Sequence, residues 1–148
     1  QVNTQGNFPW EKELITIKGD TIRVDDIFKD TNPKLLFFWF TGCTGCKISL
    51  DQTLIKHYKE WKDKFGVQII AISGDKEANR KMAVEFFRKY PFDLYFDIER
   101  ELFVFMPETP WKGKTIKAYP TLMFINSDKK FQAIDAWDAN KIKAELEK

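Results

Sequence analysis

Cysteine is scarce in this chain, with two residues among 148. The two cysteines and the single histidine, His57, offer three soft ligands, whereas a structural zinc site needs about four. A chain of this length also buries enough surface to fold without a metal or a disulfide staple. The composition therefore predicts no bound metal and no other cofactor.

A strong charge of either sign is also lacking, because 24 Lys and Arg residues face 22 Asp and Glu residues. Nucleic-acid-binding domains usually carry a strongly basic face, so this balance argues against a nucleic-acid partner. The longest fully apolar run, Leu35–Phe40, is far too short to cross a bilayer. The chain begins with Gln1 and shows no basic segment leading into an apolar one, which is compatible with a secretion signal or lipid anchor that has been removed.

Internal repeats and linker-like Gly/Ser stretches are absent from the sequence, so we expect one domain. Residues 1–13 have no periodicity and are predicted to form an irregular arm, with the domain over 14–148. Within that domain, Leu14–Ile17 and Thr21–Val24 alternate β-branched residues around a Gly-containing turn. This pattern predicts a β-hairpin.

Two apolar runs, Lys34–Phe40 and Val67–Ser73, are typical of strands buried on both faces. Between them, apolar residues recur every three or four positions, which predicts a helix over 43–64 that Gly66 ends. The remaining expected elements are a helix capped by Asp75 with Met82, Phe86 and Tyr90 inward, a strand Leu94–Phe96, a helix Glu99–Phe105, a loop around Trp111, strands Thr121–Ile125 and Phe131–Ala136, and a final helix capped by Asp138. This order predicts an α/β fold with a mixed central sheet between helices.

The cysteines, Cys43 and Cys46, are three residues apart where a predicted strand ends and a helix begins. Positions three apart in a first helical turn share a face and can meet the Cα spacing of about 5.5 Å that a disulfide needs. Unpaired N–H groups at a helix start favour a thiolate and lower the thiol pKa. We expect Cys43 to be exposed and nucleophilic, and Cys46 to resolve the mixed disulfide. Two inert, packed cysteines are the alternative.

The segment Phe38–Lys47 resembles the active-site segment of thioredoxin-like proteins, and Tyr119-Pro120-Thr121 resembles their second motif. The hairpin and Asn32-Pro33 ahead of the cysteine-bearing strand are similar to the TlpA/ResA branch of bacterial envelope reductases. The resemblance covers about 14–148. It implies a thioredoxin-like three-layer fold with an N-terminal hairpin extension, a cis peptide bond before Pro120, and thiol–disulfide exchange with protein substrates.

The resemblance also implies where a substrate binds. Gly42 and Thr44 would border it beside the pair, and Tyr119 and Pro120 would present free backbone groups to an extended segment. Trp111, in the loop ahead of Pro120, either lines the same groove or packs internally. Because the similar branch consists of envelope reductases, we expect a reductive protein of the bacterial periplasm or cell envelope that a membrane thiol transporter or similar donor recharges.

The chain departs from the family pattern near the pair. Gly42 and Gly45 stand where relatives usually carry Trp and often Pro, and Phe37 and Ser49 stand where thioredoxins and ResA-type proteins carry a carboxylate. Asp51 replaces a helix-kinking proline. A dedicated oxidant and a binding or assembly module with an incidental cysteine pair therefore stay open. A peroxiredoxin-type peroxidase would need a different setting around its cysteine, and copper delivery would need a wider cysteine spacing.

Overall fold

The computed structural model describes residues 8–106 and 108–148, and at 109–111 and 115 it describes the course of the backbone. Seven strands form one sheet in the order β2-β1-β5-β4-β3-β8-β9. They are β1 (Glu13–Thr16), β2 (Thr21–Arg23), β3 (Lys34–Trp39), β4 (Gln68–Ser73), β5 (Asp93–Phe96), β8 (Thr121–Ile125) and β9 (Phe131–Ile134). β3, β4 and β5 run parallel, whereas β8 and β9 are antiparallel to their neighbours, which confirms a mixed sheet.

Along the chain, most helical segments connect the central strands of this sheet. They are α1 (Val24–Ile27), α2 (Thr44–Ser49), the π-helix η2 (Leu50–Leu54), α3 (Ile55–Phe65), the 3-10 turn η3 (Glu77–Asn79), α4 (Arg80–Phe87), the 3-10 turn η4 (Leu102–Phe105) and α5 (Ala139–Leu146). α2, η2 and α3 are continuous and form the predicted long helix. Gly66 ends it in the left-handed conformation, with φ of 68°, as the sequence predicted.

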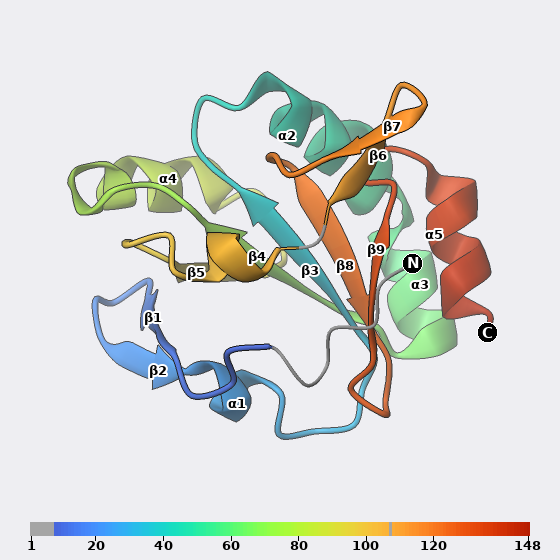
Figure 1. Ribbon diagram of the computed structural model, residues 1–148, viewed down its shortest axis with the longest axis horizontal. Helices are drawn as coiled ribbons and strands as arrows, with labels where there is room; N and C mark the ends of the chain where they lie inside the picture. Colours follow the sequence, from blue (N-terminus) through green and yellow to red (C-terminus); the bar gives the residue numbers. More distant parts are fainter. Residues whose placement is uncertain (1–7, 107) are drawn as a thin grey trace.

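Every residue of β3 is buried, which shows that both faces of the sheet are covered at this strand. Alternate side chains point to opposite faces. Leu35 and Phe37 join a core with α3, α4 and α5, whereas Leu36 and Phe38 join a second core with α1 and η4. The α1 helix lies on the far side of the sheet from α2 and α5 (Figure 1). The predicted three-layer α/β arrangement is therefore confirmed.

The predicted N-terminal hairpin is also present. β1 pairs with β2 and extends the sheet through an antiparallel contact with β5, in which Ile15 faces Phe96. Phe8, ahead of the hairpin, is buried against Phe131 with ring centroids 4.6 Å apart. Residues 1–7 lie outside the described part of the chain, and the division into an arm over 1–13 and a domain over 14–148 stays a prediction.

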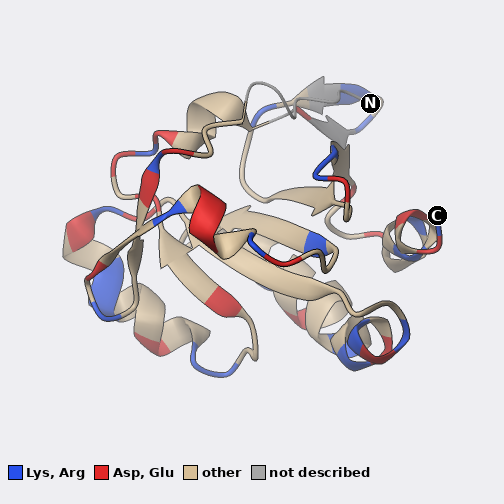
Figure 2. Ribbon diagram, turned by 90° about the horizontal axis from the view of Figure 1, so that it is seen from below, with Lys and Arg blue, Asp and Glu red and all other residues tan. Residues whose placement is uncertain are grey.

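Charged residues of both signs are spread over the outer segments, and the central strands are largely uncharged (Figure 2). The near balance of charge in the sequence is therefore matched by a mixed surface. Within the described residues, no helix is long and apolar enough to cross a membrane.

One helix prediction was wrong in its start and in one residue of its inner face. The helix after β4 begins at Arg80 and not near Asp75, because a 3-10 turn precedes it and the Asp75 carboxylate binds Thr41 instead. Its buried residues are Ala83 and Phe87, whereas Phe86 is partly buried against the same core and Tyr90, just past the helix, is buried as predicted. Met82, expected inside, is 54% exposed.

The segment between β5 and β8 also differs from its prediction. Asp97 accepts hydrogen bonds from the N–H groups of Glu101 and Leu102, so the expected helix over 99–105 is reduced to the short turn η4. The expected loop around Trp111 contains a hairpin, β6 (Thr109–Trp111) and β7 (Lys114–Ile116). Short strands around Pro and Gly give too little alternation to predict.

Candidate active site

Cys43 and Cys46 form a disulfide at the start of α2, with their Cα atoms 5.2 Å apart. Cys43 is the N-cap residue of α2, and its Sγ accepts a hydrogen bond of 3.1 Å from the backbone N–H of Cys46. The N–H groups of a helix start also favour negative charge on this sulfur. The site can therefore stabilise a Cys43 thiolate once the disulfide is reduced.

The pair is more buried than the sequence suggested. Cys46 is fully buried and Cys43 is 8% exposed, so the expectation of an exposed Cys43 was wrong. Both cysteines belong to the core on the α3 face of the sheet. Cys43 is still the more exposed residue of the two, in the order that the sequence predicted.

The turn that leads into Cys43 depends on Gly42. Gly42 has φ of +94°, a conformation that residues with a side chain rarely adopt, and the Cys43 N–H closes the turn on the Phe40 carbonyl at 3.2 Å. Gly42 and Thr44 are both exposed on either side of Cys43. These two predicted substrate-binding residues thus lie at the surface next to the pair.

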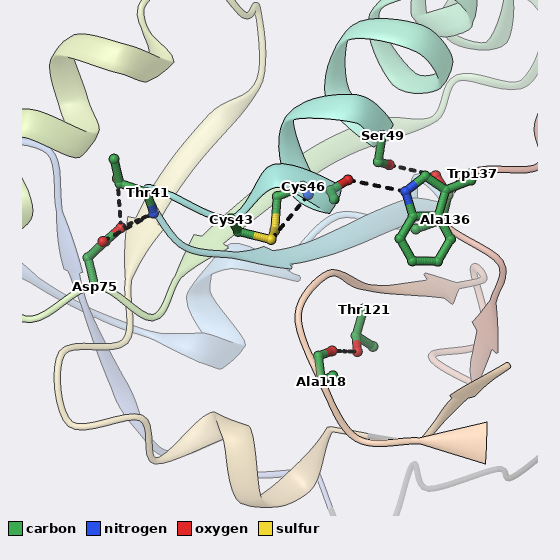
Figure 3. Close-up of a disulfide and its surroundings, with 10 residues drawn as sticks. Thr41, Cys43, Cys46, Ser49, Asp75, Ala118, Thr121, Ala136 and Trp137 are labelled. Carbon is green, nitrogen blue, oxygen red and sulfur yellow. Dashed lines mark hydrogen bonds between the residues drawn. A yellow bond between two sulfur atoms is a disulfide. The ribbon is translucent and has the colours of Figure 1, made fainter. Parts of the chain in front are cut away.

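Pro120 lies against the same helical turn. The Tyr119–Pro120 peptide bond is cis, and the Thr121 hydroxyl donates to the Ala118 carbonyl at 2.5 Å, which closes the loop around the proline (Figure 3). A Cβ atom placed on Gly45 would lie 3.5 Å from the Pro120 Cδ. The structure therefore brings Pro120 beside the cysteine motif, although the two are far apart in sequence.

The Tyr119 side chain points toward the end of β4. Its ring contacts the rings of Phe40 and Phe103, each with centroids 5.4 Å apart, and its hydroxyl lies against Gly74. Burial raises the pKa of Tyr119 to about 12. Trp111 has its backbone in β6, and its side chain lies outside the described part of the chain.

Trp137 borders the site and was not predicted from the sequence. Its indole Nε1–H donates to the Gly45 carbonyl at 3.1 Å, and its Cζ2 would lie 3.5 Å from a Cβ on Gly45. Trp137 and Pro120 therefore both contact the middle of the cysteine motif. Trp137 lies three residues after the last strand, and nothing in the local pattern marks it.

Two hydroxyl groups anchor the cysteine-bearing helix to the same segment. Ser49 donates to the Ala136 carbonyl at 2.5 Å, and Thr53 donates to the Trp137 carbonyl at 3.0 Å. Both hydroxyl residues are buried and lie one helical turn apart. Two polar residues on a buried helix face were the sequence signal for this contact.

Asp75 follows β4 and reaches the turn ahead of Cys43. Its carboxylate accepts the Thr41 N–H at 3.0 Å and the Thr41 hydroxyl at 3.1 Å. In α/β sheets, functional groups gather at the carboxyl ends of parallel strands. Asp75 and Thr41 follow the carboxyl ends of the parallel strands β4 and β3. That position was the available signal, and the expected role of Asp75 as a helix cap was wrong.

The model of the AhpC/TSA family matches residues 7–134. The chain belongs to the AhpC/TSA family. Together with the Cys43–Cys46 disulfide, this membership makes the chain an oxidoreductase of the thioredoxin-like class. No curated protein sequence matches it.

Solved structures confirm the thioredoxin-like fold. An uncharacterized thioredoxin-like protein from Porphyromonas gingivalis is 16% identical, with a TM-score of 0.71 over 93% of this chain and 88% of that one. The pneumococcal exposed lipoprotein thioredoxin of Streptococcus pneumoniae is 22% identical, with a TM-score of 0.65 and coverage of 92% and 97%. The thioredoxin domain of a thiol-disulfide oxidoreductase from Bacteroides vulgatus is 22% identical, with a TM-score of 0.63 and coverage of 91% and 92%.

Proposed function

We propose that this protein reduces disulfides in protein substrates, with Cys43 as the nucleophile and Cys46 as the resolving cysteine. The observation that carries the proposal is the hydrogen bond from the Cys46 N–H to the Cys43 Sγ at the start of α2. It gives one of the two sulfurs a donor that stabilises its thiolate. Cys43 is also the more exposed residue of the pair, so we expect a substrate to reach it first.

The exchange proceeds in two steps. The Cys43 thiolate attacks one sulfur of the substrate disulfide, the substrate S–S bond breaks, and the other substrate sulfur leaves as a thiolate that takes up a proton. Cys46 then loses its proton and attacks the Cys43 Sγ, which releases the second substrate thiolate. Counted from the dithiol, Cys43 has already released its proton to solvent to form the thiolate, and the second substrate thiolate takes up a proton from solvent. The substrate thus gains two electrons and two protons, and the protein loses two of each as the Cys43–Cys46 bond forms.

An extended substrate segment would bind across the surface between the helix start and the proline loop. Exposed Gly42 and Thr44 leave room on one side of Cys43. On the other side, the Tyr119 side chain is turned toward Gly74, which leaves the backbone beside Pro120 to pair with the segment. Trp111 is a further candidate for this groove, because β6 precedes the proline loop in the chain.

The direction, location and electron donor are part of the same proposal. The similarity to an exposed lipoprotein thioredoxin supports a periplasmic or cell-envelope protein. A reductase in that oxidising location needs a supply of electrons, which a membrane thiol transporter or similar donor would provide. The reductive direction follows the TlpA/ResA-like features of the sequence.

Trapping of the mixed disulfide tests the assigned roles. Cys46→Ser should accumulate a covalent complex with a protein disulfide such as insulin, because the resolving thiol is missing. Cys43→Ser should form no such complex and serves as the matched control. A complex that accumulates only in Cys43→Ser would reverse the two roles.

The reduction potential of the couple, measured against glutathione, tests the direction. A value near −270 mV is typical of a thioredoxin-type reductant, whereas a value near −120 mV is typical of a strong oxidant. Failure to reduce any protein disulfide, with the fold intact, would instead favour a binding or assembly module. Turnover with hydrogen peroxide alone would favour a peroxidase.

A further inference from the structure

Asp75 is a buried carboxylate next to the cysteine turn that the exchange steps above do not use. It is 4% exposed. Its Oδ2 accepts hydrogen bonds from the Thr41 N–H, the Thr41 hydroxyl and the Ser73 hydroxyl, at 3.0, 3.1 and 2.5 Å, and its Oδ1 shares the Thr41 N–H at 3.1 Å. Thr41 lies 34 positions away in the sequence, so these bonds tie the end of β4 to the residues just ahead of Cys43.

The negative charge of Asp75 is not paired with a cation. Within the described residues, no Lys or Arg forms an ion pair with it, and the nearby Arg100 donates to the Gly74 carbonyl instead. The other ionisable groups facing this cluster are the Tyr119 hydroxyl and the buried carboxylate of Asp97. Neutral donors thus hold the buried Asp75 carboxylate, and its charge is screened less there than it would be at the surface.

Cys43 is two residues from Thr41, and a closed turn connects them. Gly42 is held at φ of +94°, and the Cys43 N–H bonds the Phe40 carbonyl. The position of the Cys43 sulfur therefore depends on where Asp75 holds Thr41. The Asp75 carboxylate is bonded to Thr41, two residues ahead of Cys43, and a negative charge on the same turn opposes the formation of a thiolate.

We propose that Asp75 is a positioning residue for the exchange reaction: it fixes the Thr41–Gly42 turn that carries Cys43, and its charge keeps the Cys43–Cys46 couple reducing. The inference rests on the proposed function. Oxidising proteins of this class stabilise their reduced, thiolate form. Asp75 has the opposite effect, since it makes the Cys43 thiolate less stable and so favours transfer of electrons to a substrate.

The test separates the charge of Asp75 from its hydrogen bonds. Asp75→Asn removes the charge and keeps an acceptor for the Thr41 N–H. Thr41→Val is the matched control, because it removes only the hydroxyl donor and leaves the charge. The Cys43 thiol pKa is measured from the rate of iodoacetamide alkylation against pH, in a Cys46→Ser background where Cys43 is the single cysteine.

Asp75→Asn should lower the Cys43 pKa. With both cysteines present, it should shift the equilibrium with glutathione toward the reduced protein by about three- to tenfold, where tenfold corresponds to about 30 mV. Thr41→Val should change the equilibrium by less than about twofold, because a hydrogen bond is lost and no charge. Circular dichroism checks the fold, and Asp75→Ser, which also removes the charge, replaces Asp75→Asn if that variant is unfolded.

An unchanged Cys43 pKa in folded Asp75→Asn would overturn the inference, and so would equal shifts in Asp75→Asn and Thr41→Val. The alkylation measurement needs no disulfide exchange, so it stands apart from the proposed function. A wild-type protein that reduces no substrate, but whose Cys43 pKa falls when Asp75 is replaced, would contradict the proposed function alone.

Discussion

Asp75 and Trp137 lie on either side of the Cys43–Cys46 pair and hold the surrounding backbone by different means (Figure 3). On the Asp75 side, a buried carboxylate binds Thr41. On the Trp137 side, the contacts are neutral: the indole N–H donates to Gly45, and Ser49 donates to a backbone carbonyl. Both sides can fix geometry, and the Asp75 side adds a negative charge, which can also shift the balance between thiol and thiolate. We therefore expect a change on the Trp137 side to affect stability, and a change of charge on the Asp75 side to affect the redox equilibrium as well.

Glycine replacements compare the two sides most directly and should give the largest effect on stability. A Cβ on Gly74 would lie 2.4 Å from the Tyr119 hydroxyl oxygen, whereas a Cβ on Gly45 would meet Pro120 and Trp137 at 3.5 Å, an ordinary contact. Gly74→Ala should therefore displace the Tyr119 ring and lower the free energy of unfolding by about 2–3 kcal/mol. Gly45→Ala lies within α2 and should change it by less than about 1 kcal/mol. Urea denaturation measures both, and equal losses would show that the crowding at Gly74 relaxes freely.

Ser49→Ala removes a hydrogen bond on the Trp137 side of the pair and changes no charge. It leaves the Ala136 carbonyl without its donor in a buried setting, which should cost about 1–2 kcal/mol of unfolding free energy. The glutathione equilibrium of the couple should stay within about twofold of wild type, because no charge near Cys43 has changed. Ser127→Ala, in an exposed turn, is the control for the loss of a hydroxyl and should be neutral. A shift in the equilibrium as large as that expected for Asp75→Asn would contradict the division between the two sides.

The sequence was sufficient to predict the elements that carry the pair and the start of the last helix. The apolar run of β3, the helix that Gly66 ends and the Asp138 cap of α5 all follow from local pattern, and the structure has each of them. Asp138 accepts the N–H groups of the first helical turn, as its residue type predicts. Local chemistry dictates these features, so a single sequence reveals them.

The groups around the pair could not be predicted in the same way. The bonds from Asp75 to Thr41 and from Trp137 to Gly45 join residues 34 and 92 positions apart. Asp75 stands where a helix cap would be expected, and only the packing of β4 against β3 shows that its carboxylate turns to Thr41. The burial of Cys43 likewise depends on what the fold places over it.

Trp137→Phe tests a second hydrogen bond on the Trp137 side, with a smaller expected loss of stability than Ser49→Ala. It removes the N–H donor to the Gly45 carbonyl and keeps an aromatic ring against the helix turn. The loss should be about 1 kcal/mol of unfolding free energy, with the reduction potential unchanged. If Trp137 also contacts substrate, KM for a protein disulfide should rise in Trp137→Ala, which removes the ring, more than in Trp137→Phe. Equal KM values in both variants and wild type would limit Trp137 to a structural role.

Tyr119→Phe probes the charged side through pH and should give the smallest effect. Burial raises the pKa of Tyr119 to about 12, whereas a tyrosine in the unfolded chain loses its proton near pH 10. Between these values the folded protein binds more protons than the unfolded one, so the free energy of unfolding falls as pH rises from about 10 to 12. Below pH 10 both states keep the tyrosine proton, so this contribution no longer depends on pH. Burial also raises the pKa of Tyr90 and Tyr95, but both are present in the variant and affect it equally. Urea midpoints at pH 9 and pH 11 should therefore fall less in Tyr119→Phe than in wild type. Parallel losses would mean that the Tyr119 hydroxyl ionises in the folded protein as it does in water, and that the cluster around Asp75 is more open to solvent than its burial indicates.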